Sequence, residues 1–74
     1  MRIITLQERI EMAKISGDMM SYRMYSCLQL AAETVGASEQ AMLEMYLNKW
    51  LDEWEIIKEF ENEIEWPEEF DEEE

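Results

Sequence analysis

The sequence predicts an all-α fold, a small three-helix bundle with a long acidic C-terminal helix and a disordered acidic tail. Apolar residues make up 47% of the 74 residues and recur at helical spacing, with only two glycines and one proline to interrupt them. A chain of this length forms one domain whose core is close to the minimum for independent folding. We therefore expect a helical domain over residues 1–66 and a tail over residues 67–74.

The first helix is predicted over residues 5–16. Thr5 and Glu8 have the spacing of a capping box, in which each side chain accepts a hydrogen bond from a free backbone N–H group. Gly17 ends the helix because it adopts the left-handed conformation at low cost. The apolar residues of one helical face are Leu6, Ile10 and Ala13.

The second helix is predicted over residues 19–35, with Asp18 or Ser21 as its N-cap and Gly36 at its end. Its main apolar stripe contains Met20, Met24, Cys27, Leu28, Ala31 and Val35. Further apolar residues widen this stripe, so the helix either lies at the centre of the bundle or is buried by a partner. Because this helix is apolar on most sides, we expect part of it to be buried between the subunits of a symmetric homodimer.

The third helix is predicted over residues 38–65, with Ser38 as its N-cap. Proline cannot continue a helix, so Pro67 marks its end. The apolar residues that step by three and four along one face are Leu43, Leu47, Trp50, Trp54, Ile57 and Ile64. This spacing places Trp50 and Trp54 in the core.

Residues 28–47 resemble a helix-turn-helix motif. A small residue, Ala32, stands four positions before the turn glycine Gly36, Val35 precedes that glycine, and Ser38 caps the following helix. With the helix that begins near Thr5, the resemblance implies a homeodomain-like arrangement of three helices.

The motif departs from a DNA-binding one in its charge. The family presents the start of its second helix to base edges, and here the solvent positions are Glu39, Gln40 and Glu44. Gln40 could read adenine, but two carboxylates oppose the approach of phosphates and a basic footprint is absent. We take the motif as evidence for the fold and expect no direct binding of nucleic acid. A transcriptional regulator that acts as a helix-turn-helix dimer is kept as an alternative function.

Acidic residues are concentrated at the C-terminal end of the chain. Residues 52–74 contain thirteen acids and one base, a net charge of −12, whereas residues 1–51 contain six acids and five bases. So negative a surface repels nucleic acid and anionic membranes and attracts basic proteins. The arm is interpreted either as a solubilising segment or as the occupant of a basic groove.

The acidic helix suggests mimicry of nucleic acid. Residues 52–65 carry seven acids and one base over roughly 21 Å of helix, or about one net charge per 3.5 Å. One strand of duplex DNA carries a charge per roughly 3.4 Å. A merely solvated helical face explains the same density equally well. The partner-binding residues predicted from this pattern and from the aromatic residues among the acids are Asp52, Glu55, Glu59, Glu63, Trp66, Glu68, Glu69 and Phe70.

We expect this protein not to be an enzyme, and we expect no cofactor or metal site. The chain has no histidine, so catalytic dyads and triads that use histidine are excluded. Cys27 is the one cysteine, which fits a core position in a cytoplasmic protein.

The preferred function is an inhibitor or modulator that occupies the basic surface of a nucleic-acid-handling protein. In size and charge the chain is similar to phage-encoded anti-restriction proteins, anti-CRISPR proteins and polymerase modulators. A structural or assembly adaptor is the third alternative.

Overall fold

The computed structural model describes residues 3–67, which form four α-helices and one short 3₁₀ helix. These residues contain no β-strand, so the predicted all-α fold class is confirmed. The elements in chain order are α1 (Leu6–Ser16), α2 (Met19–Val35), α3 (Glu39–Leu47), α4 (Glu53–Phe60) and η1 (Glu61–Glu63). Residues 68–74 of the predicted tail, which include the predicted partner-binding residues Glu68, Glu69 and Phe70, lie outside the described residues.

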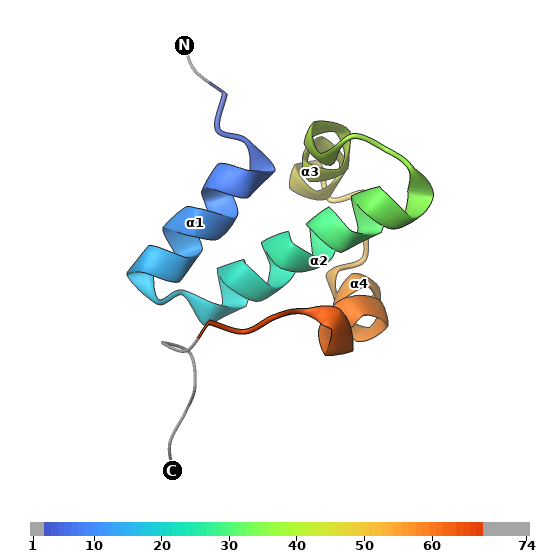
Figure 1. The fold of residues 1–74 in the computed structure, drawn as a ribbon. Helices are drawn as coiled ribbons and strands as arrows, with labels where there is room; N and C mark the ends of the chain where they lie inside the picture. Colours follow the sequence, from blue (N-terminus) through green and yellow to red (C-terminus); the bar gives the residue numbers. More distant parts are fainter. Residues whose placement is uncertain (1–2, 68–74) are drawn as a thin grey trace.

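The long helix α2 lies at the centre of the bundle and packs against α1, α3 and α4 (Figure 1). This position explains why α2 is apolar around most of its circumference. Cys27 and Leu28, near its middle, are fully buried. The other apolar residues of the core come from every helix: Leu6, Ile10, Ala13, Met24, Ala32, Met42, Leu43, Ile57 and Ile64. α2 thus has the central position that was one of the two interpretations of its apolar surface.

Local capping defines α1 as the sequence predicts. The Thr5 side chain accepts a hydrogen bond from the Glu8 backbone N–H, and the Glu8 carboxylate accepts one from the Thr5 N–H at 3.0 Å. Gly17 has a φ of 74° and ends the helix in the left-handed conformation. Asp18, rather than Ser21, caps α2, since its carboxylate accepts hydrogen bonds from the backbone N–H and the hydroxyl of Ser21. Both ends of this first corner thus follow from side-chain chemistry.

The corner between α2 and α3 has the residues that the sequence singled out. Ala32 is buried, and its carbonyl accepts hydrogen bonds from the N–H groups of Gly36 and Ala37. Gly36 has a φ of 77°, which glycine adopts without the penalty of a Cβ atom. The Ser38 hydroxyl accepts a hydrogen bond from the Ala41 N–H at 3.0 Å and caps α3.

The prediction of one continuous helix over residues 38–65 is wrong. α3 ends at Leu47, and Lys49 takes the left-handed conformation with a φ of 61°. The N–H groups of Lys49 and Trp50 donate to the carbonyls of Tyr46 and Met45, which is the Schellman arrangement that usually ends on glycine. A new helix, α4, then begins after Asp52, whose carboxylate accepts from the Trp54 N–H at 3.1 Å.

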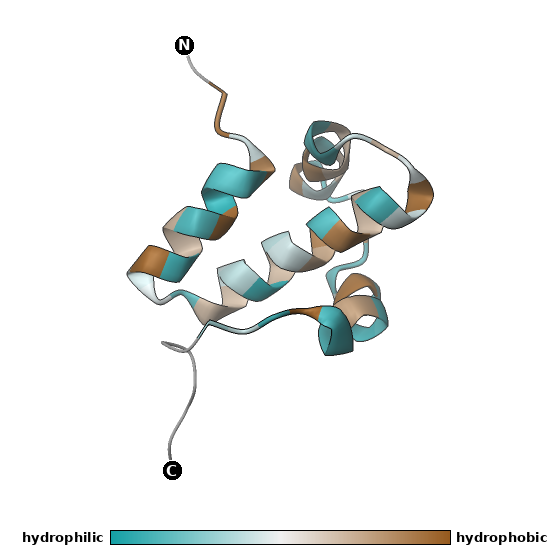
Figure 2. Cartoon of the chain, viewed as in Figure 1, coloured by the Kyte–Doolittle hydropathy of each residue, from teal (hydrophilic) through white to brown (hydrophobic). Residues whose placement is uncertain are grey.

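This break turns the chain, and the predicted core positions of Trp50 and Trp54 are therefore also wrong. Their side chains are 78% and 70% exposed, because residues that share one face of a straight helix do not share a face across the turn. Ile57 and Ile64 do lie in the core, since α4 and the segment after η1 pack back on α2. In Figure 2, hydrophobic and hydrophilic residues alternate around α4, as expected of a helix with one buried side.

The chain after η1 runs beside α2 towards the N-terminal end of that helix (Figure 1). The Tyr22 hydroxyl donates a hydrogen bond to the Glu65 carbonyl at 2.9 Å. The Trp66 ring stacks at a tilt on the Tyr22 ring, with 6.1 Å between the ring centroids. These contacts hold residues 64–67 against the bundle and, with them, the position of η1.

Candidate protein-binding surface

The exposed side of α4 carries three of the predicted partner-binding residues. Asp52, Glu55 and Glu59 are all exposed, and they are spaced so that they lie on neighbouring turns. Asp52 has a structural role as well, since it caps α4, while Glu55 and Glu59 are available to a partner. We refer to the exposed residues Asp52, Glu53, Trp54, Glu55 and Glu59 as the α4 surface.

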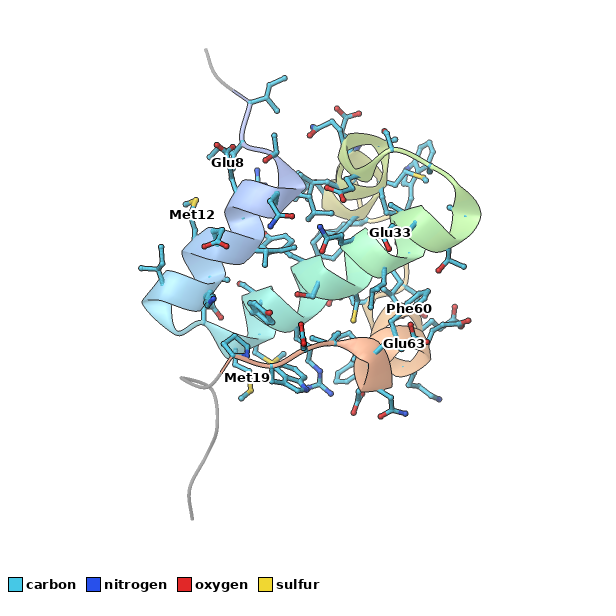
Figure 3. All side chains as sticks on the ribbon, in the orientation of Figure 1. Glu8, Met12, Met19, Glu33, Phe60 and Glu63 are labelled. Atoms are coloured by element: carbon cyan, nitrogen blue, oxygen red, sulfur yellow. The ribbon has the colours of Figure 1, made fainter. Side chains whose placement is uncertain are left out.

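Glu63 lies apart from the regular helix that was predicted to hold it. It is exposed and belongs to η1, at the far end of α4 from Asp52, and is labelled in Figure 3. α4 has eight residues, or roughly 12 Å of helix, so an evenly spaced acidic track of 21 Å does not form. The acidic charge is instead divided between the short α4 surface and the segment that follows it.

Trp66 is half covered by the protein's own side chains. Its ring contacts Tyr22, and the Arg23 guanidinium lies 6.0 Å from its centroid. The ring is 41% exposed, so one side remains open to solvent. Trp66, which the sequence analysis assigned to partner binding, thus contacts the bundle with one side of its ring and keeps the other side exposed.

The sequence interpretation missed Trp50 and Trp54 as exposed residues. Trp54 is exposed on α4, where Glu53 and Glu55 are its neighbours in the sequence, and Trp50 lies in the turn before this helix. A tryptophan indole buries a large apolar area on binding, and exposed tryptophans are frequent anchors of protein interfaces. Asn48 and Asp52, both common at helix ends, flank the break and were the sequence feature that could have revealed it.

Few basic groups offset this negative charge. Lys58 lies on α4 between Glu55 and Glu59, and Arg23 pairs with Glu61 at 2.9 Å. Next to the α4 surface, burial and then the nearby Glu53 carboxylate raise the pKa of Tyr46, so its hydroxyl stays neutral over a wide pH range. The α4 surface therefore presents a net negative charge around an apolar ring.

The start of α3 has its own polar contacts. Gln29 on α2 donates to the Glu39 carboxylate at 3.2 Å, and Gln40 donates to the Glu44 carboxylate at 3.4 Å. Gln40, the residue that the helix-turn-helix resemblance would assign to base recognition, is thus engaged with a carboxylate of its own helix. The exposed charge at this end of α3 is negative.

Cys27 has no access to a substrate. The thiol is fully buried in α2, and burial raises its pKa from an ordinary value of 9.0 to about 11. A protonated, inaccessible thiol is neither a nucleophile nor a metal ligand at neutral pH. Within residues 3–67 no three histidine, cysteine, aspartate or glutamate side chains gather in a way that could hold a metal ion.

The chain matches no protein-family model, no curated protein and no solved structure. Across the part of the chain that the structure describes, every helix is too short or too polar to span a lipid bilayer.

Proposed function

We propose that this protein binds the basic, nucleic-acid-binding surface of another protein and thereby inhibits or modulates that protein. The α4 surface is the contact region, with Trp54 as its apolar anchor and the surrounding carboxylates as the charged part. Carboxylates accelerate the encounter with a basic surface, and a ring that becomes buried slows dissociation. The nucleic acid and this protein then compete for one surface.

One observation carries the proposal, namely the 70% exposure of Trp54 on a helix whose other exposed residues are mostly acidic. A side chain that belonged to the core would be buried, as those of Leu43 and Ile57 are. A helix that serves only solubility has no use for an exposed indole, because exposed aromatic residues favour association. Charge and ring together suit a partner that is basic at its rim and has an apolar pocket.

The break before α4 limits how closely this protein can imitate nucleic acid. The short helix does not reproduce the length of a phosphate track, so the proposed competition rests on local charge and on the anchor. This distinguishes the α4 surface from a general polyanion, because removal of one neutral ring should then matter as much as removal of several charges.

Affinity capture from a lysate of the source cell, followed by competition with duplex DNA, tests the proposal. Two variants address the α4 surface: Trp54→Ala, and the double change Glu55→Gln with Glu59→Gln. The matched control is Glu33→Gln with Glu44→Gln, which removes two exposed carboxylates from α2 and α3. We expect both α4 variants to lose a basic nucleic-acid-binding partner that the control variant retains, and DNA to displace that partner from the unmodified protein.

Other outcomes would contradict the proposal in distinct ways. A partner that binds this protein and DNA together at full affinity would point to an adaptor. Sequence-selective retention of duplex DNA by this protein alone would point to a helix-turn-helix regulator. Equal losses in the control and the α4 double variant would reduce the interaction to net charge.

A further inference from the structure

A second acidic feature lies away from the α4 surface, in a groove over α2. α1 forms one wall of the groove and residues 63–65 form the other, so three segments distant in the sequence contribute to it. Figure 1 shows α2 running between α1 and the chain that follows η1. The groove has a volume of about 290 Å³. This is at the lower limit of the roughly 300–1,000 Å³ typical of small-molecule sites, so it suits a single side chain.

Ser26 lines this groove from α2, and its hydroxyl has no hydrogen bond to another described residue. It is the one polar residue counted among the buried side chains of residues 3–67, with only 8% of its surface exposed. The other helical serine and threonine hydroxyls nearby behave differently: those of Ser16 and Thr34 donate to carbonyls of the preceding turn. The Ser26 hydroxyl is not among the enclosed side-chain atoms that lack a partner, so it is reached from the groove and can bond to a polar group there.

Carboxylates surround the open side of the groove. Glu11 projects from α1, and Glu63 and Glu65 come from the opposite wall. All three are exposed, and none has a basic group within ion-pair distance among the described residues. The floor contains the apolar residues Ile10, Leu30 and Ile64. An apolar floor below carboxylates matches a cation that is carried on an aliphatic stem.

We propose that this groove binds an arginine side chain of the basic partner. The three-carbon stem lies on the apolar floor, and the guanidinium reaches carboxylates on both walls while one N–H donates to the Ser26 hydroxyl. Guanidinium suits this arrangement better than ammonium because its five N–H groups spread in a plane and can reach acceptors on two sides. The inference rests on the proposed function, since it assigns a second contact to the same kind of partner.

Lys14 lines the same groove and opposes the arginine. Its side chain is half-buried and forms no ion pair with a described residue. Its positive charge faces three carboxylates, so the groove keeps a net negative charge. Removal of this charge should strengthen the binding of a cation, which gives the proposal a prediction in the direction opposite to that of the glutamate variants.

Titration of the labelled protein with N-acetyl-arginine amide, followed by amide NMR, tests the groove directly. We expect shifts for groove residues such as Ser26 and Gln29, and none from the neutral citrulline analogue. Ser26→Ala and Glu63→Gln should each weaken binding by about fivefold, the worth of roughly one hydrogen bond. Lys14→Gln should tighten it. Glu59→Gln, which removes the same charge from α4, should change the affinity by less than about twofold since exposed distant charges are screened.

A stability measurement separates binding from folding. Ser26→Ala removes a hydroxyl that opens to the groove and has no hydrogen bond to a described residue, so the melting temperature of this variant should not fall. Weakened binding in a variant that melts like the parent assigns the hydroxyl to the ligand. A lower melting temperature would make Ser26 a structural residue, and equal losses from Glu63→Gln and Glu59→Gln would reduce the site to net charge. Equal affinity for the lysine analogue would overturn the assignment to guanidinium.

This experiment can fail independently of the proposed function. The probe is a small arginine derivative rather than a protein, and the α4 surface plays no part in its expected binding. If the groove does not bind the arginine derivative but the protein still captures its partner through Trp54, only the inference about the groove is contradicted. If the protein captures no partner but the groove still binds the arginine derivative, the proposed function is contradicted and the groove remains a site for a cation.

Discussion

The guanidinium of Arg23 and the carboxylate of Glu61 lie 2.9 Å apart, and this ion pair joins the first half of α2 to η1. Arg23 also lies over the Trp66 ring, so one side chain contacts both the start and the end of the chain segment that follows α4. Both charged side chains are partly exposed, which limits the strength of the pair. Its main effect is to fix where the C-terminal segment lies.

Arg23→Met should lower the free energy of unfolding by about 1 kcal/mol, since an exposed ion pair and a cation–π contact each contribute less than that amount in most proteins. Methionine keeps the apolar stem and removes the charge. Urea unfolding of this variant, of Glu61→Gln and of the double variant gives the coupling between the two residues. We expect a favourable coupling that shrinks as salt is added. A Glu61→Gln cost that is the same with and without Arg23 would show that the pair contributes nothing.

Trp54→Ala should leave the unfolding free energy within about 0.5 kcal/mol of the parent, because surface substitutions away from special features have small effects. Leu43→Ala, at a fully buried position, should cost about 2–5 kcal/mol. Thermal melts of the two variants compare an exposed and a buried residue directly. A large loss of stability in Trp54→Ala would place the ring in the core and remove the anchor from the α4 surface.

Two residues in the left-handed conformation should respond to substitution in opposite directions. A Cβ atom at Gly36 would meet open space, so Gly36→Ala should cost about 1 kcal/mol through backbone strain alone. Lys49→Gly should stabilise the protein by about 0.5–1 kcal/mol, because it relieves the same strain at the turn before α4. Chemical denaturation measures both. Destabilisation by Lys49→Gly would contradict the break between α3 and α4.

Cys27 should make the protein less stable in alkali. Its pKa is raised on folding, so the folded protein keeps the thiol proton that the unfolded chain loses. The contribution of the thiol is therefore fully present below about pH 9 and is lost as the pH rises towards about 11. Urea midpoints at pH 8 and pH 10 should fall more in the parent than in Cys27→Ala. Equal declines in the two proteins would assign the pH dependence to other groups.

The ends of the first two helices could be predicted because single residues determine them. Thr5, Gly17, Gly36 and Ser38 act within a few residues of their own position, so no knowledge of tertiary contacts is needed. The sequence left two candidate N-caps for α2, Asp18 and Ser21. The structure decides for Asp18, whose carboxylate accepts a hydrogen bond from the Ser21 N–H. The central position of α2 was likewise one of two alternatives, because burial by other helices and by a partner require the same apolar surface.

The break in the predicted third helix could not be read from apolar spacing. Leu43, Leu47, Trp50 and Trp54 continue the helical period across it, and a lysine fills the position where glycine is usual. The packing of Ile57 and Ile64 on α2 outweighs the local preference for a continuous helix. This one turn accounts for the errors in the candidate site: it exposes the two tryptophans and separates Glu63 from the carboxylates of α4.

The central position of α2 also bears on how the protein opens. α1 and α4 each pack on α2, while α1 meets α3 only at a small interface. An outer helix can therefore detach while the rest of the bundle stays folded. The amide hydrogens of α2 become exposed to solvent only when all of the helices packed on it have detached. The amide hydrogens in the middle of α2 should exchange with solvent at the rate of global unfolding, and those of α4 and η1 should exchange by local opening. A partner that holds α4 would then be detected as slower exchange in that helix alone.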